Sequence, residues 1–141
     1  MTEKTEHKGA ISPMARQIEE AMSVSSLNGT SGSVEATFTF NEDFAGFQGH
    51  FPSNKIFPGV CQVQCVLALL GRWQDSEARL TELTNVKYVL PIVPGDVITC
   101  RITGLKELEG DVFSLKASIH KGSERVSDFR LKARLVHHQA S

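Results

Sequence analysis

An almost uninterrupted apolar helix is the feature of this chain that most constrains its fold. Between about Gly59 and Trp73 the apolar side chains point in every direction of a helical turn; they are Val60, Val63, Val66, Leu67, Leu69 and Leu70. A helix that is apolar all round is buried on most of its sides. The rest of the chain therefore has to wrap around this segment.

Alternation of apolar and polar residues predicts the strands that do the wrapping, because period-two patterning is typical of half-buried strands. The alternating runs cover residues 34–40, 98–102, 113–119 and 129–135, and 86–90 is a further candidate that ends at Pro91. One long buried helix with a series of antiparallel strands indicates an α+β layer architecture, a sheet wrapped around the helix. The chain lacks alternating βαβ units, which argues against a nucleotide-binding parallel sheet.

The length of 141 residues indicates one domain. We expect a single domain at 13–136, with a flexible tail at 1–12 and a short C-terminal tail at 137–141. Ser12 and Pro13 are typical of an N-cap followed by proline at the first helical position, so a short amphipathic helix should follow them.

Composition excludes several classes of function. The formal net charge is -1, so no global field attracts nucleic acid or an anionic membrane. The N-terminal residues are polar and contain no apolar signal region, and the apolar stretch from Val60 to Leu70 is far too short to span a bilayer. The three cysteines are an odd number without framework spacing and are interpreted as reduced thiols. We therefore expect a cytoplasmic protein without nucleic-acid or membrane partners.

The candidate chemistry lies in the loop that leads into the apolar helix. His50 stands among glycines and prolines, which impose an unusual backbone path and favour a catalytic loop over simple packing. A surface or satisfied core histidine remains the alternative. Gly59 opens the helix, and its free backbone N–H could hold a developing oxyanion. Alternatively, Pro58 and Gly59 do no more than start the helix.

Two glutamines, Gln62 and Gln64, interrupt the apolar helix. Burying an amide without partners costs about 1–3 kcal/mol, so each must face a polar cavity or a specific partner. Residues two positions apart point to different helix faces, so at most one of them can line the same site as His50. A partly solvated helix edge or a subunit contact would explain either residue as well as a site would.

Two further groups have both a functional and a structural interpretation. Cys61 and Cys65 share a helix face and could form a metal or redox pair, but no flanking ligand supports this, which favours core thiols. Arg130, Lys132 and Arg134 form an alternating basic face that could meet an acidic partner or could be a solvated outer face.

Two segments carry a family likeness. The stretch from Phe47 to Val60 resembles the Gly-His-Phe-Pro…Pro-Gly-Val signature of the hotdog-fold 3-hydroxyacyl-acyl-carrier-protein dehydratases of fatty acid synthesis. Residues 86–96 are similar to the lysine-aromatic strand and Val-x-Pro-Gly-Asp turn of that family, and the likeness covers roughly residues 33–136. With Gln62 three positions after Gly59, the chain resembles the branch of the family that is associated with aryl polyene-type pathways.

The resemblance implies a hotdog fold, with a curved antiparallel sheet wrapped around one long central helix. It also implies side-by-side homodimers, or higher homo-oligomers, with shared active sites at the subunit interface. His50 would remove the α-proton of the substrate, and Gly59 would offer its N–H to the thioester carbonyl. Phe51, Pro58 and Val60 would contact the substrate, which arrives on the phosphopantetheine arm of acyl carrier protein. No cofactor and no metal are implied.

One position departs from the family pattern. The carboxylate that the partner subunit's helix supplies in this family, as the proton donor to the departing hydroxyl, corresponds to Gln64. An amide has no titratable proton near neutral pH, and loss of one acid–base group typically costs about 10²–10⁴ in rate. The loop also carries Ser53 in place of a glycine and Lys55 in place of a proline.

Three functions are therefore open. The first is a dehydratase-like hydro-lyase of fatty acid or related polyene biosynthesis, in which Gln64 orients the hydroxyl. The second is a non-catalytic accessory subunit that binds acyl thioesters. The third is an acyl thioesterase, in which a histidine and an amide position water.

Overall fold

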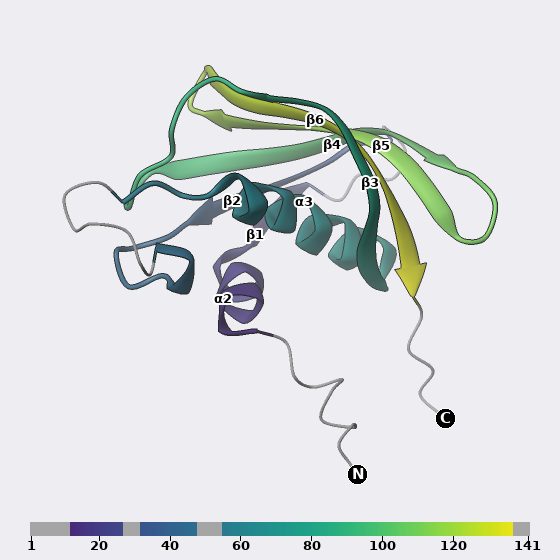
Figure 1. Ribbon diagram of the computed structural model, residues 1–141, viewed down its shortest axis with the longest axis horizontal. Helices are drawn as coiled ribbons and strands as arrows, with labels where there is room; N and C mark the ends of the chain where they lie inside the picture. Colours follow the sequence, from purple (N-terminus) through teal and green to yellow (C-terminus); the bar gives the residue numbers. More distant parts are fainter. Residues whose placement is uncertain (1–11, 27–31, 48–54, 137–141) are drawn as a thin grey trace, which may run out of the picture.

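One curved antiparallel sheet and two helices make up the described part of the chain. The computed structural model describes residues 12–26, 32–47 and 55–136. The elements in chain order are α2 (Pro13–Ala21), β1 (Ser23–Ser26), β2 (Val34–Thr39), the 3-10 turn η1 (Ala45–Phe47), α3 (Gly59–Gln74), β3 (Glu77–Tyr88), β4 (Val97–Glu107), β5 (Val112–Lys121) and β6 (Glu124–Val136). The strands pair in the order β1-β2-β4-β5-β6-β3. Figure 1 shows this sheet arching over α3, which confirms the predicted α+β architecture.

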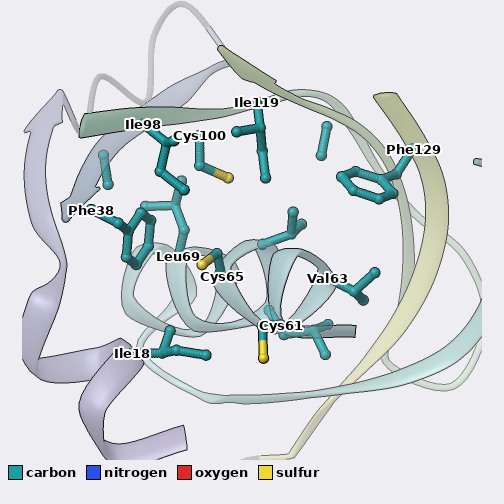
Figure 2. Close-up of a cluster of buried hydrophobic side chains, with 14 of the residues drawn as sticks. Ile18, Phe38, Cys61, Val63, Cys65, Leu69, Ile98, Cys100, Ile119 and Phe129 are labelled. Carbon is teal, nitrogen blue, oxygen red and sulfur yellow. The ribbon is translucent and has the colours of Figure 1, made fainter. Parts of the chain in front are cut away.

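The core lies between the concave face of the sheet and α3. Figure 2 shows residues of the sheet such as Phe38, Ile98 and Cys100 pointing at α3 from one side, while Ile18 of α2 closes another side. These side chains are at most 1% exposed. The predicted burial of α3 is confirmed for most of its length, but Val60, its second residue, is 68% exposed. No helix among the described residues is long and apolar enough to cross a membrane.

The sequence predicts tails at the two ends of the chain. Residues 1–12, apart from Ser12, and residues 137–141 lie outside the described residues. Ser12 is the N-cap of α2, as predicted, since its hydroxyl oxygen accepts a hydrogen bond from the N–H of Ala15 at 3.0 Å.

The strand pattern differs from the prediction at β1 and β3. β1 has only four residues, three of them serine, so no alternation is visible. β3 begins at Glu77, nine residues before the predicted position at Val86. It lies at the end of the strand order and pairs only with β6 among the described strands. Most of its side chains are exposed on both faces, which removes the alternation on which the prediction depends.

A tight turn after β3 holds the segment that leads into α3. Asp96 organises this turn, because its carboxylate accepts hydrogen bonds from the Val93 N–H at 2.8 Å and the Lys121 ammonium at 3.1 Å. The neighbouring Ile92 carbonyl accepts a hydrogen bond from the Phe57 N–H at 2.7 Å. Phe57 is 1% exposed, so this bond fixes the backbone two residues before α3 begins. The turn at the end of residues 86–96, which the family resemblance implies, therefore positions the start of the helix.

We expect Asp96→Ala to lower the free energy of unfolding by about 1.5–3 kcal/mol, because it removes a charged acceptor from two donors. Asp96→Asn is the matched control. It keeps an acceptor for Val93 and loses only a partly exposed ion pair, so it should cost less than about 1 kcal/mol. Urea denaturation measures both values. Equal losses would show that the hydrogen bond from the Val93 N–H to Asp96 does not stabilise the turn.

Candidate active site

The start of α3 presents free backbone donors. Within the described part of the chain, the N–H groups of Gly59 and Val60 have no hydrogen-bond acceptor. The N–H groups of Cys61 and Gln62 both donate to the Pro58 carbonyl, at 3.0 and 3.1 Å. The helix is 16 residues long, so the partial positive charge of its N-terminus adds to these donors. Such a helix start can stabilise an oxygen that gains negative charge.

Tyr88 lies directly against Gly59. A β-carbon placed on Gly59 would collide with the ring and hydroxyl of Tyr88, so only glycine allows this approach. The ring also meets Phe129 edge-on, with centroids 5.8 Å apart. Partial burial raises the pKa of the Tyr88 phenol above its usual value, which keeps the hydroxyl protonated as a hydrogen-bond donor. The sequence places Tyr88 in a lysine-aromatic motif but gives no sign of its contact with Gly59.

Gln62 is buried and bonded to β6. Its side-chain oxygen accepts a hydrogen bond from the Ser127 hydroxyl at 2.7 Å. Gln62 is 4% exposed and Ser127 0%, and they are the two buried polar residues of the described chain. Ser127 is not predicted from the sequence, because Val126 and Ser127 are both buried beside an irregularity in the pairing of β5 and β6, where alternation fails.

Gln64 occupies a different face of α3. It is partly exposed, and no hydrogen bond joins it to another described residue. The two glutamines thus face different surroundings, as their spacing requires. The structure brings Pro58, Gly59 and Val60 together at the helix start, with Val60 exposed. The predicted base His50 and the predicted substrate contact Phe51 lie outside the described residues, so their roles stay predictions.

The cysteines lie in the core. Burial raises the pKa of the Cys61 thiol to about 11 and that of Cys100 to about 12, and it raises the pKa of Cys65 as well. Protonated thiols are poor nucleophiles and poor metal ligands, which favours the interpretation as core thiols. Within residues 12–26, 32–47 and 55–136, no group of three or more histidine, cysteine or acidic side chains could hold a metal ion.

The basic face of β6 turns away from α3. Lys132 pairs with Glu82 of β3 at 3.5 Å, and the Arg134 guanidinium donates to the Gly110 carbonyl at 2.7 Å. Both cations therefore interact within their own chain, which favours a solvated outer face over a surface for an acidic partner.

Known proteins resemble the chain over most of its length. Residues 26–130 match the model of the ApeI-like family, described as ApeI dehydratase. The chain is 32% identical over 111 residues to the 3-hydroxyacyl-acyl-carrier-protein dehydratase FabZ of Helicobacter hepaticus, a match that covers 70% of this chain and 64% of that protein. The FabZ of Helicobacter pylori strain G27 is also 32% identical over 111 residues, with 68% of its length covered. The chain thus spans roughly two thirds of these relatives, and slightly less for Helicobacter hepaticus.

Solved structures share the fold. The dehydratase heterocomplex ApeI:P from Xenorhabdus doucetiae gives a TM-score of 0.62 at 19% identity, over 73% of this chain and 88% of that chain. The Escherichia coli PaaI protein gives a TM-score of 0.62 at 16% identity, over 93% of this chain and 91% of that chain. At such low identities these likenesses concern the fold alone, and they confirm the predicted hotdog fold.

We expect Gly59→Ala to lower the free energy of unfolding by about 1–3 kcal/mol, because the new methyl group overpacks against Tyr88. In a Tyr88→Ala background the same change should be neutral or stabilising, since alanine is the better helix former. A double-mutant cycle from urea denaturation measures the coupling. Equal costs in both backgrounds would show that the Tyr88 contact does not explain the glycine.

Proposed function

The chain belongs to the ApeI-like family of dehydratases, and on this premise we propose that it is a hydro-lyase acting on 3-hydroxyacyl thioesters of acyl carrier protein. Its place would be in fatty acid or related polyene biosynthesis. The observation that carries the proposal is the start of α3, where the Gly59 N–H has no acceptor among the described residues and the Tyr88 side chain lies against Gly59. The FabZ relatives, named for this reaction, support the same assignment.

Elimination of water needs a base, a site for developing charge and a proton for the leaving group. In our proposal the His50 imidazole removes the α-proton, and the thioester carbonyl oxygen gains negative charge near the Gly59 N–H. The carbon–oxygen bond at the β-carbon then breaks. Gln64 accepts or donates a hydrogen bond to orient the departing hydroxyl but has no proton to give. The proton that His50 has taken can return to this hydroxyl, which leaves as water.

The free edge of β3 supports a proposed assembly with a second subunit. Among the described strands only β6 pairs with β3, and the exposed apolar side chains Leu80, Val86 and Tyr88 lie along β3. Exposed strand edges with apolar side chains favour pairing with another chain. A homodimer joined at this edge would bring the start of one α3 near the other subunit. We propose that Gln64 acts in the site of the partner in this way.

A second function follows from Gln64 itself. Because this residue replaces the carboxylate expected from the family pattern, the chain could bind acyl thioesters without turning them over. It would then serve as an accessory subunit beside a dehydratase that carries the acid. The related ApeI:P structure is a heterocomplex, so an assembly of unlike subunits has a precedent in this fold.

His50→Ala should reduce hydration of a crotonyl thioester by about 10²–10⁴, the usual cost of losing an acid–base group. The assay follows loss of the enoyl absorbance, and release of free thiol in the same assay would reveal thioester hydrolysis instead. His137→Ala is the matched control, since this histidine follows the last residue of β6. Equal rates for His50→Ala and wild type would rule out His50 as the base.

Gln64→Glu separates the enzyme from the accessory subunit. If the chain is the accessory subunit, the new carboxyl group should raise dehydration of a 3-hydroxyacyl thioester by about 10²–10⁴ over a near-zero background. If the chain is the enzyme, wild type should already turn over and the gain should be small. Gln74→Glu, at the other end of α3, controls for the added charge.

A further inference from the structure

Four residues close a ring of contacts at the start of α3. Gly59 and Gln62 are three positions apart and share a helix face. The Ser127 hydroxyl donates to the side-chain oxygen of Gln62 at 2.7 Å. Ser127 is the register partner of Tyr88, and Tyr88 lies against Gly59. The helix, β6 and β3 thus meet around one small polar region beside the free N–H of Gly59.

The side-chain NH₂ group of Gln62 has no hydrogen-bond partner among these four residues. The side-chain oxygen bonds to Ser127, which also fixes the direction of the NH₂ group, on the opposite side of the amide carbon. No described residue accepts a hydrogen bond from this NH₂ group, although Gln62 is 96% buried (4% exposed). A buried donor without an acceptor is costly, so the structure requires an acceptor from elsewhere.

The acceptor should lie near the first turn of the helix. Side chains on an α-helix lean towards its N-terminus, so the Gln62 side chain extends back towards Gly59. The Gly59 N–H also lacks an acceptor among the described residues. A single oxygen at this place would satisfy both donors. An oxygen that becomes negatively charged would gain most, because donors that are fixed in advance stabilise such charge strongly.

We propose that the Gln62 carboxamide is a second hydrogen-bond donor, beside the Gly59 N–H, to the carbonyl oxygen of a bound acyl thioester. Ser127 is a positioning residue, because its hydroxyl holds the Gln62 oxygen and so turns the NH₂ group towards this carbonyl. The inference rests on the proposed function for the substrate class. It adds Gln62 as a catalytic residue and Ser127 as the residue that orients it.

Kinetics of dehydration give the first test. Gln62→Met keeps the length of the side chain and removes the donor, so kcat should fall about 10- to 100-fold with little change in KM, since the bond strengthens as charge develops. Ser127→Ala leaves the amide in place but unheld, and should lower kcat by a smaller factor. Gln74→Met, at the far end of α3, is the matched control and should leave kcat unchanged.

Infrared spectroscopy of a bound analogue gives a test that needs no turnover. A saturated butyryl-pantetheine thioester with an isotope-labelled carbonyl cannot be dehydrated, and hydrogen bonds to its oxygen lower the stretching frequency. In wild-type protein the frequency should lie below its value in water. Gln62→Met should move it upwards, Ser127→Ala should move it upwards by less, and Gln74→Met should not move it.

The outcomes separate this inference from the proposed function. The wild type could fail to dehydrate and still show a lowered carbonyl frequency that is lost in Gln62→Met. This result would support the inference and overturn the proposed dehydratase function. Equal frequencies in wild type and Gln62→Met would overturn the inference, even if the wild type is an active dehydratase. If the analogue does not bind, both fail. Circular dichroism of each variant checks that the fold is intact.

Discussion

Burial of α3 on nearly all sides is the constraint on which the rest of the structure depends. A helix this apolar needs cover from several directions, and one flat sheet could protect only one face. The sheet therefore curves, and α2 closes a further side through Ile18 (Figures 1 and 2). At the start of the helix Val60 is exposed, and the backbone N–H groups of Gly59 and Val60 have no acceptor among the described residues.

The same constraint explains why polar groups gather at that edge. Inside the core a polar side chain needs a bonded partner, and Gln62 and Ser127 provide one for each other. Tyr88 comes from the edge strand β3 and can lie against α3 because Gly59 has no side chain. A largely apolar interior with a few convergent donors is the usual form of a small-molecule site. The proposed acyl-thioester chemistry uses this polar edge.

Gln64 separates the catalytic interpretation from the binding one. Both interpretations use the same helix start and the same polar groups around it. They differ only in whether a proton can reach the leaving hydroxyl, which an amide cannot provide. An active enzyme has to recycle the proton through His50, whereas an accessory subunit needs only the carbonyl donors.

The sequence alone determined the buried helix, most of the strands and the turn that ends in Asp96, because these depend on local periodicity and turn chemistry. It also singled out Gly59 and the two glutamines, since a polar residue in an apolar helix is visible without a structure. Only the tertiary structure decided the length of β3 and the partner of Gln62. An edge strand exposed on both faces shows no alternation, and Ser127 is buried where irregular pairing breaks it. The approach of Tyr88 to Gly59 joins residues 29 positions apart in the chain, and no local pattern records a contact of that kind.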